Sequence, residues 1–353
     1  MITSKLDIRG LSLEEIKSII NIEGKESFRA GQVFHWVQAR AAQSWSEMAN
    51  IGPAVRKMLA EKTCLQPLEL VRERASRDGT RKFLWRLADD NSVESVLLYH
   101  RGDITKARYT VCLSTQVGCA MGCVFCATGK LGFKRNLTTG EIVAQVLDIT
   151  SHRRNEEPGF KVGNLVYMGM GEPLLNLPTV IKSIKILNHK AGQNIGIRRI
   201  TVSTCGLVPQ IEELAGLGLD IVLAVSLHAP TNELRNRIMP INKKYPLEEL
   251  IAACRRYIEK TGRRVSFEYA LIKNFNDSPR EAKLLSRLLQ GVKANVNVIP
   301  VNAVKGNEIL RPGTKEIRGF VRLLKELGVN AVLREEKGSD IEAACGQLAG
   351  KMR

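Results

Sequence analysis

From about residue 105 to residue 340, the chain alternates short runs of β-branched or apolar residues with longer helical patterns. The strand-like runs are YTVCLST, NLVYMGM, RRITVST, DIVLAVSLH, RVSFEYALI, NVNVIPVN and NAVLREE. Helical patterns lie between them, as in TTGEIVAQVLDITSHRR, where Thr138 and Glu141 have the spacing of a capping box. This alternation predicts an α/β fold, with a parallel sheet covered by helices that forms either an open doubly wound sheet or a partial barrel.

Glycine-rich or polar stretches directly follow five of these strands. They are GCAMGCVFC, GMGEPLLN, STCGLVP, SLHAP and PVNAVKGN. In α/β folds the functional site is built from the loops at the carboxyl ends of parallel strands. We therefore expect these five loops to converge on one site.

The first of these loops contains Cys119, Cys123 and Cys126, with three residues between the first pair and two between the second. Three thiolates at this spacing can hold a 4Fe-4S cluster and leave one iron free for a substrate or cofactor. The pattern is the signature of radical S-adenosylmethionine (SAM) enzymes, in which that iron binds SAM and the cluster cleaves it to a 5′-deoxyadenosyl radical. A structural zinc site is the alternative, but zinc sites usually take four ligands in paired C-x-x-C knuckles, and no second knuckle exists here.

The charge of the chain indicates its partner. The formal net charge is +17, and the basic residues are spread along the chain rather than confined to a tail, which favours nucleic acid. Aromatic residues make up only 5% of the chain, which argues against a base-stacking platform of the RNA-recognition-motif kind. The chain has no apolar N-terminal run or membrane span, and its eight cysteines are not in a disulfide-dense arrangement, so we expect a cytoplasmic protein without membrane contact.

We expect the chain to be divided into four parts. Residues 1–65 read as short helices, which predict an N-terminal accessory domain and a candidate RNA contact. Residues 66–104 carry strand patterns that extend the sheet, and residues 105–340 form the barrel. Residues 341–353 form a separate C-terminal segment.

Several long motifs, in this order, give the whole chain a close resemblance to the bacterial radical SAM methyltransferases that act on carbon 2 of adenine in 23S ribosomal RNA and transfer RNA. The motifs are FRAGQVFHWV, VESV, VCLSTQVGCAMGCVFCATGKLGF, YMGMGEPLLN, ITVSTCGLVP, LAVSLHAPTNELRNRIMPINKKYP, VNVIPVN and DIEAACGQLAG. The resemblance implies a partial (β/α)6 radical SAM barrel with a small N-terminal helical accessory domain.

The same resemblance implies roles for individual residues. The three loop cysteines would ligate the cluster, and Gly171 and Glu172 would meet the amino group of SAM. The rest of the SAM pocket would be lined by Ser203, Ser226, Leu227, His228 and Asn302. Each of these has a plainer interpretation: a glycine-rich loop is often only a turn, and a histidine can be a buried packing residue.

The chemistry that the resemblance implies uses two further cysteines. Cys345 would take a methyl group from one SAM, and the radical made from a second SAM would activate that methyl for addition to carbon 2. Cys112 would then attack the Cys345 sulfur, release the methylated base and leave a transient disulfide, while Glu94 would accept the carbon-2 proton. The implied partners are 23S rRNA, tRNA and an electron donor such as flavodoxin or ferredoxin, and we expect a monomer.

Two other functions remain open. A related enzyme methylates carbon 8 of adenine and confers antibiotic resistance, but it has alanine where this chain has Pro173. A non-catalytic iron–sulfur RNA-binding protein is the second alternative, and the Cys112/Cys345 pair argues against it because a binding protein needs no carrier and no resolving thiol. We expect the remaining cysteines to be buried as small apolar side chains; they are Cys64, Cys205 and Cys254.

Overall fold

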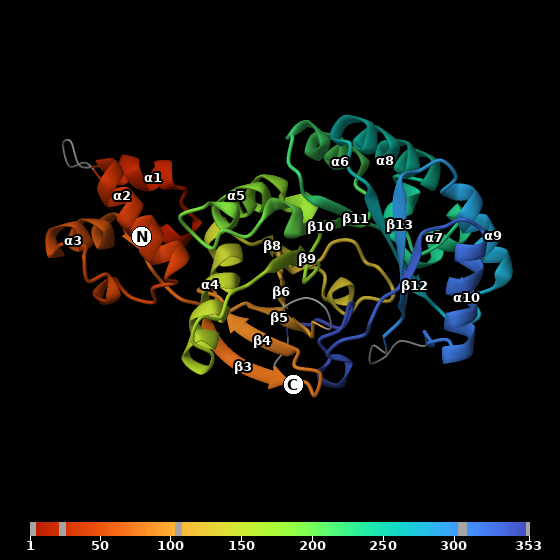
Figure 1. The fold of residues 1–353 in the computed structure, drawn as a ribbon, viewed down its shortest axis with the longest axis horizontal. Coiled ribbons are helices and arrows are strands. Elements are labelled where there is room, and N and C mark those ends of the chain that lie inside the picture. Colours follow the sequence, from red (N-terminus) through yellow and green to blue (C-terminus); the bar gives the residue numbers. More distant parts are fainter. Residues whose placement is uncertain (1–4, 21–25, 103–107, 303–308, 351–353) are drawn as a thin grey trace.

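The computed structural model describes residues 5–20, 26–102, 108–302 and 309–350. One ten-stranded sheet dominates it, in the order β14-β13-β12-β11-β10-β9-β6-β5-β4-β3 (Figure 1). The parallel strands are β6 (Arg108–Cys112), β9 (Asn164–Tyr167), β10 (Ile200–Thr204), β11 (Val222–Ser226), β12 (Val265–Leu271), β13 (Ala294–Pro300) and β14 (Ala331–Leu333). The sheet continues past β6 with three antiparallel strands: β5 (Ser92–His100), β4 (Arg81–Arg86) and β3 (Glu69–Ala75).

The strand predictions are confirmed, because each of the seven runs named above contains one parallel strand. The sheet curves (Figure 1), and among the described residues its two edge strands, β14 and β3, do not pair with each other. It is therefore an open barrel, as predicted. β14 adds a seventh parallel strand to the six that a (β/α)6 barrel requires.

Helices follow the parallel strands and cover the outer face of the sheet (Figure 1). They are α4 (Thr139–Glu156), α5 (Leu177–Asn188), α6 (Val208–Gly216), α7 (Asn232–Ile238), α8 (Leu247–Thr261), α9 (Pro279–Leu288) and α10 (Thr314–Glu326). In α10, Ile317, Phe320, Val321 and Leu324 are buried, which is the spacing of one apolar helical stripe. Burial of such a stripe against the sheet holds each helix in place.

Short elements join these strands and helices. The 3-10 helices are η1 (Ile8–Gly10), η3 (Trp45–Glu47), η4 (Thr128–Leu131), η5 (Pro173–Asn176), η6 (Ile197–Arg199), η7 (Pro240–Lys243) and η8 (Ser339–Ile341). Two pairs of short strands, β1 (Leu6–Asp7) with β2 (Thr63–Cys64) and β7 (Gln116–Gly118) with β8 (Phe133–Asn136), lie outside the main sheet.

The first helices, α1 (Leu13–Ile19), α2 (Glu26–Phe34) and α3 (Pro53–Lys62), lie together at one end of the molecule beside α4 and α5 (Figure 1). A π-helical turn, η2 (His35–Ala39), continues α2. The short helices expected in this region are thus present among its described residues. Among the described residues, no helix is both long enough and apolar enough to cross a membrane.

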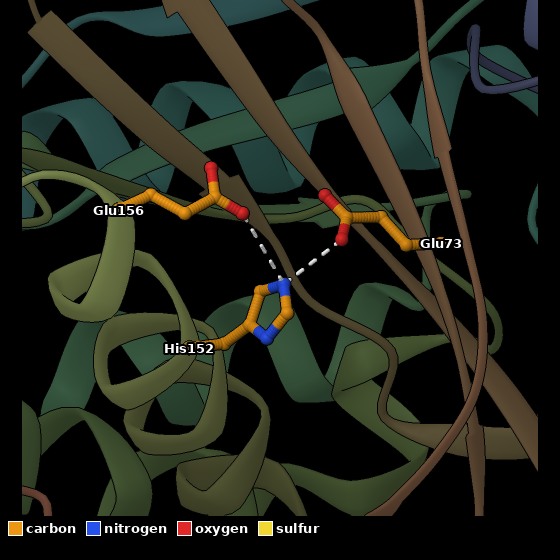
Figure 2. Close-up of side chains that lie close together, drawn as sticks. All are labelled: Glu73, His152 and Glu156. Atoms are coloured by element: carbon orange, nitrogen blue, oxygen red, sulfur yellow. Dashed lines mark hydrogen bonds and ion pairs between the residues drawn. The ribbon is translucent and has the colours of Figure 1, made fainter.

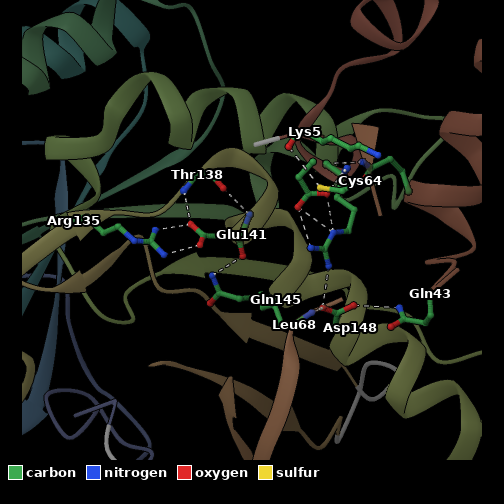
Figure 3. Close-up of polar contacts among 12 residues, drawn as sticks. Lys5, Gln43, Cys64, Leu68, Arg135, Thr138, Glu141, Gln145 and Asp148 are labelled. Carbon is green, nitrogen blue, oxygen red and sulfur yellow. Dashed lines mark hydrogen bonds and ion pairs between the residues drawn. The ribbon is translucent and has the colours of Figure 1, made fainter. Parts of the chain in front are cut away.

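Helix α4 joins this helical region to the sheet (Figure 3). At its start, the Thr138 hydroxyl accepts from the Glu141 N–H at 3.2 Å and the Glu141 carboxylate accepts from the Thr138 N–H at 2.8 Å, which confirms the capping box. Further along, the buried Asp148 carboxylate accepts hydrogen bonds from the Leu68 N–H at 2.8 Å, from Gln43 at 3.1 Å and from Arg9 at 3.3 Å. One carboxylate on α4 therefore holds three separate points of the N-terminal region.

Candidate active site

A cavity of about 460 Å³ lies inside the curved sheet. Its walls come from β5, β6, β9, β13 and β14 and from the segment after β14. Three of the cysteines singled out from the sequence, Cys112, Cys126 and Cys345, line this one cavity. The carboxyl end of β6, the cysteine-rich loop and the C-terminal segment therefore meet at a single space.

The loop with the three cysteines is held by backbone contacts. Cys119 donates its N–H to the Gly132 carbonyl at 2.9 Å, next to the β7–β8 pair. Gly118 has φ of +74°, and a Cβ there would overlap the Gly132 carbonyl oxygen, so this position requires glycine. Met121 and Phe125 pack on a buried apolar cluster that includes Ile238 and Met239. The loop is thus anchored to the barrel on its inner side.

The three loop cysteines suit a cluster better than a single ion. All are half-buried, and their sulfur atoms do not all lie within 4.8 Å of one another in the described chain. Zn–S bonds of about 2.3 Å would bring tetrahedral ligands to about 3.8 Å, whereas a cube of four irons needs wider spacing. Burial raises the pKa of Cys119 to about 11, and the neighbouring thiols oppose one another's ionisation. Their thiolates therefore need compensating positive charge, which bound iron supplies.

The GMGEP loop has a constrained backbone. Gly171 has φ of +103°, and a Cβ there would lie 2.6 Å from Cβ of Gln116. The buried Glu172 carboxylate accepts hydrogen bonds from the Cys205 N–H at 2.8 Å and the Leu174 N–H at 3.1 Å, and burial raises the pKa of Glu172. Glu172 thus joins the loops after β9 and β10.

His228 contacts the cysteine loop. It has φ of +59°, and its ring meets Phe125 edge-to-face with 4.7 Å between ring centroids. Burial lowers the pKa of His228 to about 3, so the ring is neutral at pH 7. The Ala270 N–H donates to Nδ1 at 2.9 Å. The ring proton is therefore on Nε2, which makes Nε2 a donor.

Arg235 is a residue that the sequence analysis missed. Its fully buried guanidinium donates to the carbonyl oxygens of Cys205 at 2.7 Å, Ser226 at 3.0 Å and Leu227 at 3.1 Å, and to Asn242 Oδ1 at 2.8 Å. Burial lowers the pKa of Arg235 to about 10. The side chain fixes the loops after β10 and β11 relative to each other.

The other residues predicted for the SAM pocket differ in their relation to the cavity. The Ser203 hydroxyl donates to the Tyr167 carbonyl at 2.8 Å and so lies between β10 and β9. Asn302 lines the cavity beside Cys345 and donates its side-chain N–H to the Cys345 carbonyl at 3.1 Å. The Asn302 Oδ1 atom is buried without a hydrogen-bond partner among the described residues, so it is available to a ligand. Of the seven predicted SAM-pocket residues, only Asn302 is on the described wall of this cavity.

Cys112 and Cys345 both line the cavity and interact electrostatically. Burial, with a smaller contribution from the Cys345 thiol, raises the pKa of Cys112 to about 12. The Cys345 side chain is exposed to the cavity. Loss of hydration within the protein raises the pKa of Cys345, and the positive charge of Arg334 opposes this rise. All eight cysteines are free thiols here, so the structure contains no Cys112–Cys345 disulfide.

Backbone contacts hold the C-terminal segment that carries Cys345. The Thr128 hydroxyl donates to the Leu348 carbonyl at 2.6 Å, and the Ala127 N–H donates to the Gly346 carbonyl at 2.7 Å. Ala343, Ala344 and Leu348 are buried. The position of Cys345 therefore depends directly on the loop with the three cysteines.

The Glu94 side chain also holds the C-terminal segment in place. Its carboxylate, 3% exposed, pairs with Lys82 at 3.1 Å and accepts from the N–H groups of Ala349 at 2.6 Å and Gly350 at 3.0 Å. Burial of Glu94 is therefore as expected for a residue sharing a strand face with Val96. However, Glu94 is absent from the described cavity wall, and its carboxylate already accepts from donors of this chain.

A second cluster of polar side chains lies away from the cavity, where Glu73 and Glu156 flank His152 (Figure 2). His152 Nε2 is 2.8 Å from Glu73 and 3.8 Å from Glu156. Arg81 pairs with the same two carboxylates, at 2.7 Å and 3.0 Å. Arg81 thus already neutralises the negative charge that would otherwise attract a metal ion to this cluster.

Comparison with known proteins agrees with this geometry. Residues 113–285 match the model of the radical SAM superfamily, and residues 6–65 match that of the ribosomal RNA large subunit methyltransferase N-terminal domain. A "Probable dual-specificity RNA methyltransferase RlmN" from Heliobacterium modesticaldum is 50% identical over 344 residues, which cover 98% of this chain and 89% of that protein. The chain belongs to the RlmN family of radical SAM methyltransferases.

Further relatives of the RlmN family match over similar lengths. The protein of the same name from Thermotoga neapolitana is 50% identical, with 97% of each chain covered. A crystal structure of a radical SAM methyltransferase from Sphaerobacter thermophilus superposes with a TM-score of 0.92 at 45% identity, covering 98% of this chain and 100% of that one. Family and fold predictions made from the sequence are therefore confirmed.

Proposed function

We propose that this enzyme methylates carbon 2 of a specific adenine in 23S rRNA and in certain tRNAs. One observation carries the proposal: Cys112, Cys345 and Cys126 from the cysteine-rich loop line one cavity. A carrier thiol, a resolving thiol and a cluster ligand must meet in this way if all three are to act on one bound base. Relatives with half of their residues identical to this chain bear the name of a dual-specificity RNA methyltransferase.

Cys119, Cys123 and Cys126 would hold a 4Fe-4S cluster. Gly171, Glu172, Ser203, Ser226, Leu227, His228 and Asn302 would hold SAM. When bound, the cluster and two SAM molecules per turnover supply a methyl group and a 5′-deoxyadenosyl radical. The unpartnered Oδ1 of Asn302 and the Nε2–H of neutral His228 provide an acceptor and a donor for the polar groups of SAM.

The thiols of this chain perform the transfer. Cys345 would accept the methyl group at sulfur and lose its thiol proton. The RNA would then become bound to this sulfur through the methylene carbon, with loss of one hydrogen atom from the methyl group to the deoxyadenosyl radical, one proton from carbon 2 to Glu94, and one electron that the bound cluster would take back. The Cys112 thiolate then attacks the Cys345 sulfur, which forms an S–S bond and breaks the S–C bond. The electron pair of the broken bond stays with the base and takes up a proton. A thiol reductant afterwards reduces the Cys112–Cys345 disulfide.

Glu94 is our proposed acceptor of the carbon-2 proton. Its carboxylate would have to release the Ala349 and Gly350 amides to reach the base, so movement of the C-terminal segment would accompany this step. The domain division follows the same reasoning: residues 1–65 as an accessory RNA-contacting domain, 66–104 as the sheet extension, 105–340 as the barrel and 341–353 as the carrier segment. We place the reaction in the cytoplasm, with a monomeric enzyme and a flavodoxin or ferredoxin as electron donor.

The deciding experiment is peptide mass mapping of Cys345 after anaerobic reconstitution with iron, sulfide and methyl-labelled SAM. We expect the label on Cys345 and not on Cys254, which is buried in α8 and serves as the internal control. A Cys112→Ala variant should leave RNA attached to Cys345, because nothing resolves the S–C bond. An unlabelled Cys345 with SAM bound would refute the carrier mechanism and favour the non-catalytic binding protein.

The carbon-8 enzyme remains the second candidate function, and Pro173 in the GMGEP motif is the residue that disfavours it. Nuclease digestion of the RNA product followed by mass spectrometry separates the two, since 2-methyladenosine and 8-methyladenosine elute differently. We expect only the 2-methyl product.

A further inference from the structure

The cavity has two chemically different ends. Strands β5 and β6 contribute paired residues to its wall in three alternate pairs: Val96 with Cys112, Leu98 with Thr110, and His100 with Arg108. Cys112 is four positions along the strand from Arg108, which corresponds to about 13 Å at about 3.3 Å per residue. The wall therefore runs from a thiol at one end, past small and apolar side chains, to a basic group at the other.

Three cations line the cavity. Arg108 lies at the end away from Cys112, and Arg334 and Lys337 come from the segment after β14. The charge of Arg334 acts on Cys112 and Cys345 as well as on His100, so this arginine lies near the thiols too. The His100 side chain lies near all three cations. Burial and the charges of Arg108, Lys337 and Arg334 lower the pKa of His100. The imidazole is therefore neutral at pH 7, and it can donate a hydrogen bond without adding charge.

The acids nearby offset part of this positive charge, and one of them is the buried Glu268 carboxylate, which interacts electrostatically with Arg334. Glu335 pairs with Lys337 at 3.1 Å, and Glu336 pairs with Arg311 rather than with a cation of this group. Among the described residues, neither Arg108 nor Arg334 has an ion pair. Positive charge in a concave site attracts anions, and guanidinium groups match phosphate oxygens in geometry.

We propose that Arg108, Arg334 and Lys337 bind a backbone phosphate of the RNA while the base of the adjoining target nucleotide reaches Cys112 and Cys345. This inference rests on the proposed function for its substrate. An enzyme that reacts at a base takes the nucleotide out of its stack, so the phosphate of that nucleotide is drawn toward the cavity with it. The strand length between the two ends is a distance that one extended nucleotide can bridge, with the phosphate at Arg108, the sugar over Leu98 and Thr110, and the base at Cys112.

The test is RNA binding by fluorescence anisotropy, using the full chain without cluster and a labelled hairpin RNA that contains the target adenosine. Arg108→Gln and Lys337→Gln should each weaken binding about tenfold and reduce the salt dependence of the binding constant by about one phosphate. Glu335→Gln should strengthen binding, because it removes the carboxylate that pairs with Lys337. Arg318→Gln, an exposed arginine on α10, is the matched control and should bind as the wild type does.

Neutralising single phosphates of the RNA identifies the phosphate that the cations contact. Hairpins with an uncharged methylphosphonate at each phosphate flanking the target adenosine should bind the wild type more weakly at one position. At that position the Arg108→Gln variant should show no further loss, because the charge pair is already broken. Additive losses at every position would overturn the proposal, as would wild-type RNA affinity and salt dependence in both Arg108→Gln and Lys337→Gln.

Two further readouts separate this proposal from its rivals. If Arg108→Gln weakens SAM binding in equilibrium dialysis and leaves RNA binding unchanged, the cations hold SAM and the proposal is wrong. Methylation of Cys345 without RNA tests the proposed function independently, and the control variant Arg318→Gln should leave it intact. A wild-type chain that binds the hairpin through these cations but never methylates Cys345 would refute the methyltransferase function and keep the phosphate site.

Discussion

Removal of the negative charge of Glu94 should release the C-terminal segment that carries Cys345. In Glu94→Gln, the two backbone amides of Ala349 and Gly350 lose a charged acceptor, and the ammonium of Lys82, which is 8% exposed, loses its counter-charge. A hydrogen bond to a charged group contributes about 1.5–3 kcal/mol, and breaking a buried ion pair costs about 3–5 kcal/mol. These overlapping effects make about 3 kcal/mol a conservative loss of docking free energy.

A loss of about 3 kcal/mol raises the opening equilibrium of the segment roughly 100-fold, since about 1.4 kcal/mol corresponds to a factor of ten. Amide hydrogen exchange read by mass spectrometry measures this directly. Peptides covering residues 343–350 should exchange about 100 times faster in Glu94→Gln, whereas peptides from α8 (Leu247–Thr261) should keep their rates.

Glu335→Gln is the matched control, because Glu335 is an exposed carboxylate shortly before this segment and contacts neither of these amides. It should leave exchange in residues 343–350 unchanged. Unaltered protection of these residues in Glu94→Gln would refute the reasoning. Equal acceleration throughout the chain would show that Glu94 supports global folding and not this segment in particular.

Three further predictions follow from single residues. Gly171→Ala should lower the free energy of unfolding by about 2 kcal/mol or more in urea titrations, because φ is +103° and the added Cβ would meet Gln116; unchanged stability would contradict the close contact. Alkylation of Cys112 by iodoacetamide, followed by peptide mass spectrometry, should accelerate about tenfold per pH unit from pH 7 to 10, since its pKa is about 12; a plateau below pH 9 would contradict this. Since the pKa of His228 falls from 6.5 to about 3 on folding, the unfolded chain binds the proton more readily and stability decreases as pH falls through that window; between pH 7 and 5 the wild type should lose up to about 2 kcal/mol more than His228→Gln.

Much of the fold follows from local sequence. The alternation of short apolar runs and helical patterns predicts the parallel strands, because each buried strand needs only a few consecutive apolar residues and each covering helix an apolar stripe. Thr138 and Glu141 mark the start of α4 for the same reason, since the capping box is a contact between neighbours in the chain. The seventh parallel strand is short, Ala331–Leu333, and local sequence alone does not show whether it joins the barrel.

The site is predictable only in part. The two-residue period of a strand puts Cys112 and Thr110 on the same face, and both line the cavity. The contact of Glu94 with Ala349 spans 255 residues, and no local pattern indicates such a pair. Arg235 is missed for a related reason: it lies in a short polar helix, where an arginine is normally exposed, and only the packed loops show that their carbonyls surround it.

The position of the C-terminal segment in the chain also sets the order in which the parts of the site are synthesised and assembled. Residues 343–350 dock on Ala127, Thr128 and Glu94, and the ribosome makes them after every other part of the site. Chains generally begin to fold from the N-terminus as they are synthesised. The barrel and its cysteine loop can thus be assembled while the carrier thiol is still missing, so a chain whose synthesis stops early would have the loop for a reactive cofactor but no sulfur to receive the methyl group.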